Sequence, residues 1–124
     1  MRRRREPDEL DELIEEILVD AYNEDEQVSA FATVLGDEIP LPCEATVLGI
    51  PVQVLEIDYD GEPPGVVARC CRDRHTQNLA LTELTFPDGS IAAWLQAAYL
   101  RYLGHDPGKA TPPPGWRLRA WDQD

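Results

Sequence analysis

The chain has 124 residues, of which 43% are hydrophobic, so it is long enough for one globular domain with its own core. Its formal net charge of -13 argues against nucleic acid and anionic membrane surfaces as partners, because their phosphates would repel it. No stretch has the length of a membrane span, and no apolar signal segment follows the basic run at residues 2–5, so we expect a cytoplasmic protein.

The first third of the chain is acidic and has the spacing of two helices. Eleven Asp or Glu residues lie between Glu6 and Glu26, with no Lys, Arg or His among them. Apolar residues recur there at helical spacing, and Asp8 suits the positive end of a helix dipole. Asn23 followed by Glu26 has the pattern of a capping box at the start of a second helix. These signals predict a helical hairpin over residues 7–38 with an acidic corner.

After the two predicted helices, between about residues 45 and 84, the helical spacing of apolar residues gives way to short runs rich in β-branched residues, separated by Gly, Pro and Asp. Val52 and Val54 would face one side of a strand, whereas Ile57 and Tyr59 would face the other. This change of parity predicts a bulge or sharp bend near Val54. Several short, bent strands within about forty residues predict a small SH3-like β-barrel over residues 43–85.

A third helix is predicted over residues 90–103, with Ser90 as its cap and an apolar stripe along one face. The expected fold is therefore α+β, with the helical hairpin and this later helix packed on the barrel in a single domain over residues 1–104. The remaining residues, 105–124, form a tail rich in Pro and Trp. The sequence leaves open whether the tail docks on the domain through Trp116, Leu118 and Trp121.

The acidic corner is one candidate metal site, with Asp20, Glu24 and Asp25 as candidate ligands. Calcium takes about six to eight oxygen ligands and accepts mixtures of carboxylate, amide and backbone carbonyl. A tight turn between two helices can bring such groups together. The alternative is an ordinary helix cap with surface acids, since Asn23 and Glu26 already have a capping role.

The turn of the barrel is a second candidate site, with Glu56, Asp58, Asp60 and Glu62 as candidate ligands. Alternation along a strand places the first three on one side, and a cation would offset their mutual repulsion. The segment does not match the EF-hand pattern, and its Asp-Gly pair is also a common hairpin turn. We expect Asp58 and Asp60 to be ligands slightly ahead of the corner, because Gly61 lets the backbone fold round an ion.

No motif in the chain indicates catalysis. Cys43, Cys70 and Cys71 are expected to be reduced thiols, and the two histidines lack the spacing of a zinc site. Glycine-rich phosphate loops and serine nucleophile motifs do not occur in the sequence. We therefore expect a protein that is not an enzyme.

Residues 15–27, with the sequence EEILVDAYNEDEQ, resemble the opening of a small bacterial calcium-binding protein family typified by the cyanobacterial protein CcbP. The family continues with a second helix, a proline-containing link and a β-rich half with an acidic turn. Residues 39–42 and 58–62 fall at the places of that link and that turn. The family's second helix is rich in aromatic residues, whereas only Phe31 is aromatic here, and the third helix lies outside the shared pattern.

The resemblance implies an acidic cytoplasmic calcium-binding protein, a buffer or a sensor, with helices packed on a small barrel. The expected ligand is a calcium ion held by surface carboxylates, with no nucleic acid or membrane partner. The alternative is an SH3-like protein-interaction module without a metal site, in which the acidic residues only keep the protein soluble.

Overall fold

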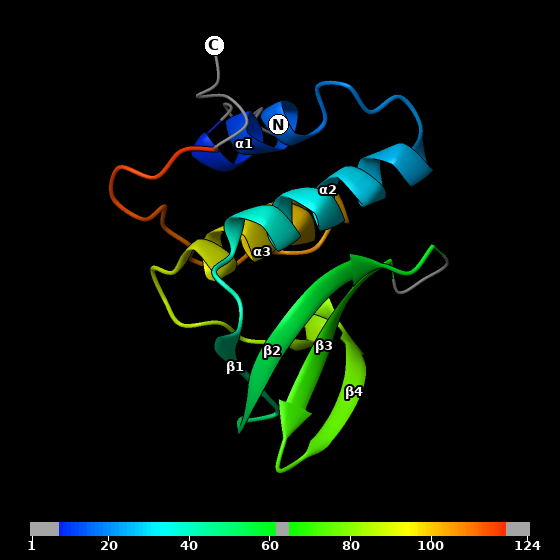
Figure 1. Cartoon of the computed structure of the whole chain (residues 1–124). Helices are drawn as coiled ribbons and strands as arrows, with labels where there is room; N and C mark the ends of the chain where they lie inside the picture. Colours follow the sequence, from blue (N-terminus) through cyan, green and yellow to red (C-terminus); the bar gives the residue numbers. More distant parts are fainter. Residues whose placement is uncertain (1–7, 62–64, 119–124) are drawn as a thin grey trace.

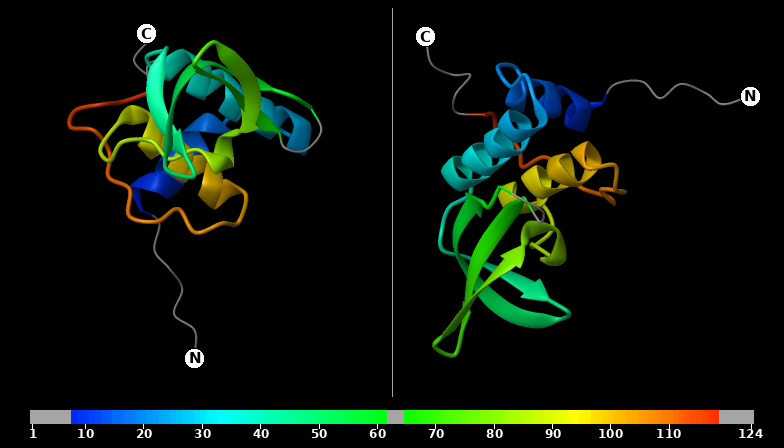
Figure 2. Two further views of the ribbon diagram at one scale, coloured as in Figure 1. Left: turned by 90° about the horizontal axis from the view of Figure 1, so that it is seen from below. Right: turned by 90° about the vertical axis from the view of Figure 1, so that its right-hand side faces the viewer.

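The computed structural model describes residues 8–61 and 65–118, and it confirms the predicted α+β class (Figure 1). Figures 1 and 2 show the helices α2 and α3 lying between the sheet on one side and α1 on the other. None of the described helices is long and apolar enough to cross a membrane. In chain order the elements are α1 (Glu9–Ile17), α2 (Glu24–Glu38), β1 (Cys43–Val47), β2 (Ile50–Tyr59), β3 (Val66–Arg72), β4 (His75–Ala80), the short 3-10 helix η1 (Leu81–Glu83) and α3 (Ile91–Tyr102).

Short-range capping fixes where the helices begin. The side chain of Asp8 accepts from the N–H of Asp11 at 3.0 Å and starts α1. Asn23 caps α2 as predicted, since its Oδ1 accepts from the N–H of Glu26 at 2.9 Å. The carboxylate of Glu26 bonds the N–H of Tyr22 at 2.8 Å, one residue before the cap. The expected cap of α3 is also confirmed, because Ser90 Oγ accepts from the N–H of Ala93 at 3.1 Å.

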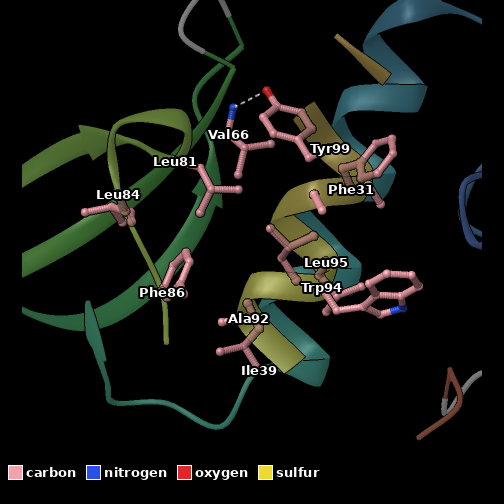
Figure 3. Close-up of a cluster of buried hydrophobic side chains, with 14 of the residues drawn as sticks. Phe31, Ile39, Val66, Leu81, Leu84, Phe86, Ala92, Trp94, Leu95 and Tyr99 are labelled. Carbon is pink, nitrogen blue, oxygen red and sulfur yellow. Dashed lines mark hydrogen bonds between the residues drawn. The ribbon is translucent and has the colours of Figure 1, made fainter. Parts of the chain in front are cut away.

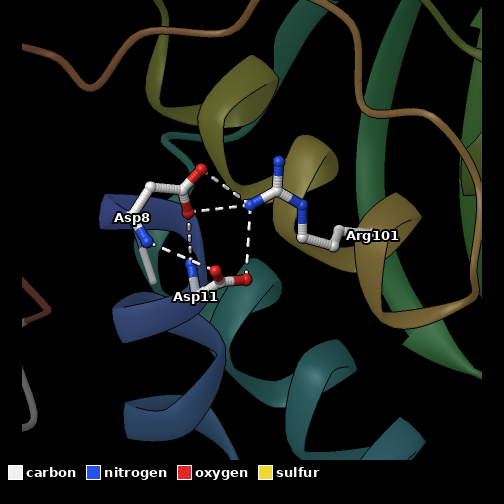
Figure 4. A network of polar contacts seen from close by, with 3 residues as sticks. All are labelled: Asp8, Asp11 and Arg101. Atoms are coloured by element: carbon white, nitrogen blue, oxygen red, sulfur yellow. Dashed lines mark hydrogen bonds and ion pairs between the residues drawn. The ribbon is translucent and has the colours of Figure 1, made fainter. Parts of the chain in front are cut away.

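The predicted helical hairpin is not confirmed, because α1 packs more extensively on α3 than on α2. Figure 4 shows one contact between these helices at the start of α1, where the guanidinium of Arg101 in α3 lies beside the carboxylates of Asp8 and Asp11. Arg101 Nη1 is 2.7 Å from Asp8 Oδ1 and 3.3 Å from Asp11 Oδ1. These two ion pairs join the start of α1 to α3, and the buried residues Leu10, Leu13 and Ile17 pack the same helix into the core.

The four strands form an antiparallel sheet in the order β1-β2-β3-β4. The register of β2 against β3 shifts between Val54 and Glu56, which confirms the predicted bulge. The predicted closed SH3-like barrel is not confirmed, because no ladder joins β4 to β1 in the part of the chain that the structure describes. Instead, Thr85, which follows β4 and η1 in the chain, makes two backbone hydrogen bonds with Thr46 of β1, at 2.8 and 2.9 Å. This single bridge links edge strand β1 to the segment that follows β4.

The core extends from the sheet past α2 and α3 to α1. Figure 3 shows its part around α3 and the sheet, and α1 adds Leu10, Leu13 and Ile17 on the other side of the helix pair. Gln96 of α3 is buried, and its Nε2 donates to the carbonyls of Leu81 and Leu84, which ties η1 to the helix layer. Near the end of the described chain, Leu118 is buried in this core and Trp116 is half-buried against it. Trp121, the third residue considered for docking, lies outside the described residues.

Candidate functional site

The acidic corner lies against the end of β2. Tyr59, the last residue of β2, donates its hydroxyl hydrogen to Asp25 Oδ1 at 2.5 Å, and Asp25 lies in the first turn of α2. The acidic corner therefore meets the strand that leads into the acidic turn, although 34 positions separate Tyr59 from Asp25.

The β-bulge decides which side chains of β2 face the helices. Val54 is buried against the core, so strict alternation would place Asp58 on that same side. The register shift between Val54 and Glu56 adds one residue to β2, and the half-buried Ile57 and Tyr59 occupy the inner side instead. The bulge thus places a phenol, and not a carboxylate, opposite the acidic corner.

An open pocket of about 900 Å³ lies between the start of α2, the end of β2 and the end of α3. Its wall combines carboxylates with aromatic and aliphatic groups, and we call it the corner pocket. The lining residues are Asn23, Glu24, Asp25, Glu26, Val28, Tyr59, Gly61, Gly65, Tyr99 and Leu103.

Gly65 closes one wall of the corner pocket in a conformation that suits only glycine. Its φ is +78°, and a Cβ at this position would lie 2.9 Å from the hydroxyl oxygen of Tyr99. The same hydroxyl accepts from the N–H of Val66 at 3.3 Å, while the carbonyl of Gly65 accepts from the N–H of Asp60 at 2.8 Å. The start of β3 is therefore held closely against α3.

The negative charge of Glu24 at the corner acts on the phenol of Tyr102 in α3. Burial raises the pKa of the Tyr102 phenol, and the charge of Glu24 raises it further. Tyr102 donates its hydroxyl hydrogen to Gln27 Oε1 at 2.9 Å and packs against Phe31 with a centroid separation of 5.0 Å. Glu24 thus lies close enough to this aromatic group to disfavour its ionisation.

Of the seven predicted ligands, the structure brings Glu24 and Asp25 together at the corner pocket. Asp20 lies on a separate groove, described below. Asp58 accepts from the N–H of Tyr59 at 2.8 Å and lines a different pocket beside α2.

The other three predicted ligands lie away from the pocket lining or outside the described residues. Glu56 pairs with Arg69 in the register of β2 and β3. Asp60 is exposed and does not line the corner pocket. Glu62 lies outside the described residues.

The described residues contain no group of three His, Cys, Asp or Glu side chains that could hold a metal ion. The cysteines lie on the sheet, away from the corner, and all three are free thiols. Burial raises the pKa of Cys43 and of Cys70, which face each other across Val54 in the strand register. A metal at the corner pocket would therefore bind oxygen atoms. It would need more of them than Glu24 and Asp25 supply, and the third lining carboxylate, Glu26, already accepts from the N–H of Tyr22.

Tyr59, Tyr99 and Gly65 line the corner pocket but were not among the predicted site residues. The change of parity along β2 was used only to predict the bulge, but it also separates the side of Tyr59 from that of Val54 and was the available signal for Tyr59. Comparison with protein-family models, with curated proteins and with solved structures gives no match to this chain.

Proposed function

We propose that the chain is a non-enzymatic, cytoplasmic calcium-binding protein, and that calcium binds where the acidic corner meets the end of β2. The observation that supports this best is the hydrogen bond from Tyr59 to Asp25. It joins the acidic corner to the strand end that leads into the acidic turn, the two regions that the family resemblance singles out.

The chemistry of the corner suits a hard cation, because its polar side-chain groups are carboxylate, amide and phenol oxygens and one amide nitrogen. In this proposal Glu24 and Asp25 are the charged ligands. Backbone carbonyls and water supply the rest of the six to eight oxygens that calcium takes. With two carboxylates as the charged ligands, we expect a modest affinity, with a Kd of about 10⁻⁶ to 10⁻³ M.

A titration of the ¹⁵N-labelled full chain with CaCl₂, followed by backbone NMR, tests the proposal. We expect saturable shifts concentrated at residues 23–26 and 59–61, with weaker effects from MgCl₂, which demands a tighter octahedral geometry. NaCl at equal ionic strength is the control for screening. Shifts that do not saturate, or that NaCl reproduces, would overturn the proposal.

The alternative is an SH3-like protein-interaction module without a metal site. The bridge between Thr46 and Thr85 supports a sheet that curls towards a small barrel. The exposed Leu48 at the β1–β2 turn supports a contact surface on that sheet. The same titration separates the two functions, since the interaction module predicts no saturable calcium shifts.

A further inference from the structure

A second hollow lies on the other side of the acidic corner, between the end of α1, the loop after it and α2. It is an open groove of about 540 Å³, which we call the corner groove. Its lining residues are Glu16, Ile17, Val19, Asp20, Ala21, Tyr22, Glu26, Ala30, Val34 and Leu118. The groove has an apolar floor and walls, while its charged residues are all acidic.

Two large apolar side chains at the corner groove remain exposed to solvent. Val19 is 55% exposed and Tyr22 is 83% exposed, whereas Ile17, which lines the same groove, is buried. Single exposed apolar residues are ordinary on protein surfaces. Two of them beside an apolar groove are the arrangement expected of a contact surface that a partner covers.

The charge of the corner groove indicates the chemistry of that partner. Glu16, Asp20 and Glu26 lie around it, and none of its lining residues is basic. The chain as a whole has a formal charge of -13, which attracts cationic molecules and speeds their encounter with the groove. The same charge opposes the approach of a second copy of the chain.

We propose that the corner groove binds a basic amphipathic segment of another protein. Apolar side chains on one face of that segment would contact Val19 and Tyr22, and its Lys or Arg side chains would pair with Glu16, Asp20 and Glu26. An amphipathic helix in an apolar groove is a recurrent mode of recognition, with anchors three or four residues apart. The acidic side chains around the groove would align the bound segment and speed its association with the chain. Burial of apolar surface would supply most of the binding free energy.

The chain offers a matched control for this surface. Leu48 and Ile50 at the β1–β2 turn are also large, apolar and exposed, at 95% and 46%, and neither lines the corner groove. Replacing Val19 and Tyr22 by Ser, or Leu48 and Ile50 by Ser, therefore removes comparable exposed apolar groups from two different places. All four side chains are exposed, so both variants should fold.

The test uses a fluorescein-labelled synthetic helix of about 14 Leu and Lys residues in amphipathic spacing, which is about four helical turns. Its binding to the full chain is followed by fluorescence anisotropy in calcium-free buffer at about 0.15 M salt, where the Debye length is about 8 Å. We expect saturable binding that Val19→Ser with Tyr22→Ser weakens at least about tenfold. The variant Leu48→Ser with Ile50→Ser should bind as the unaltered chain does, and a peptide with Ser in place of Leu should not bind.

Equal peptide binding by both double variants would mean that charge alone attracts the peptide, and it would overturn the proposal. Absence of peptide binding by the unaltered chain would also overturn it.

Two other occupants of the corner groove are tested directly. A chain ending at Leu118 that binds the peptide more tightly would assign the groove to residues 119–124 of the chain itself. Self-association that only the Val19 and Tyr22 substitutions abolish would assign it to a second copy. Because the buffer contains no calcium, failure here would leave the proposed calcium site untouched.

Discussion

The phenol of Tyr59 at the end of β2 donates a hydrogen bond of 2.5 Å to the carboxylate of Asp25 in the first turn of α2. The contact lies where β2 and α2 meet, along one edge of the corner pocket. It orients the carboxylate of Asp25 towards the end of β2.

Replacing Tyr59 by Phe removes this hydrogen bond and leaves the ring in place. We expect the free energy of unfolding to fall by about 1 kcal/mol, the usual net value of one hydrogen bond. Urea unfolding followed by circular dichroism measures the change. Tyr22→Phe is the control, since Tyr22 is 83% exposed, and should change stability by less than about 0.5 kcal/mol. Equal effects of the two changes would contradict a special role for the Tyr59 contact.

The ion pairs of Arg101 predict a second loss of stability. The Arg101 side chain is only 18% exposed, so its contacts with Asp8 and Asp11 are less screened than a surface pair. Arg101→Gln should lower the free energy of unfolding by about 1–2 kcal/mol in the unaltered chain. The same substitution should cost less in a chain that already carries Asp8→Asn, because the ion pair is then already lost. Independent, additive effects of the two substitutions in a double-mutant cycle would show that the pair does not hold α1 on α3.

Gly65 and Gly61 form a matched pair of glycines. Both have positive φ, +78° and +84°, but a Cβ at Gly65 would lie 2.9 Å from the hydroxyl oxygen of Tyr99, whereas one at Gly61 would meet nothing within 4 Å. Gly61→Ala should cost about 1 kcal/mol through backbone strain alone. Gly65→Ala should cost about 2–3 kcal/mol, because the side-chain clash adds to that strain. Similar melting temperatures for the two variants would contradict the close approach of the start of β3 to α3.

The raised pKa of Tyr102 predicts how stability depends on pH. Burial and the charge of Glu24 favour the neutral phenol in the folded chain, so its folded pKa lies above the ordinary value of 10.0. The stability that this neutral phenol contributes is complete below about pH 10 and is lost as pH rises through the raised pKa. Unfolding free energies measured from about pH 8 to 11 should therefore fall less steeply in Tyr102→Phe than in the unaltered chain. Parallel curves would contradict the assignment.

The sequence was sufficient for features that depend on neighbouring residues. Asn23 and Ser90 are caps because their side chains bond amides three residues on, and the bulge follows from a change of parity within one strand. The arrangement of the helices could not be predicted in this way. It depends on contacts between residues far apart in the chain, such as Arg101 with Asp8, 93 positions away.

In the candidate site, too, the local features could be predicted from the sequence and the long-range contacts could not. The acidic corner and the acidic turn were each visible as local clusters of carboxylates, but the contact of Asp25 with Tyr59 depends on how α2 packs on β2. The preference for Asp58 and Asp60 rested on the cluster of carboxylates at the turn, on the freedom of Gly61 and on the capping role of Asn23 and Glu26. The bulge favours the inner side of β2 for Tyr59, so we now place the proposed site at Glu24 and Asp25.

Calorimetric titration of calcium into the full chain and two double variants tests the central proposal most directly. The corner variant is Glu24→Gln with Asp25→Asn, and the turn variant is Asp58→Asn with Asp60→Asn. Each removes two charges while keeping side-chain shape. We predict that the corner variant binds calcium at least about tenfold more weakly than the unaltered chain, about 1.4 kcal/mol, and that the turn variant loses less. Absence of calcium binding by the unaltered chain, or a larger loss in the turn variant, would contradict the proposed site.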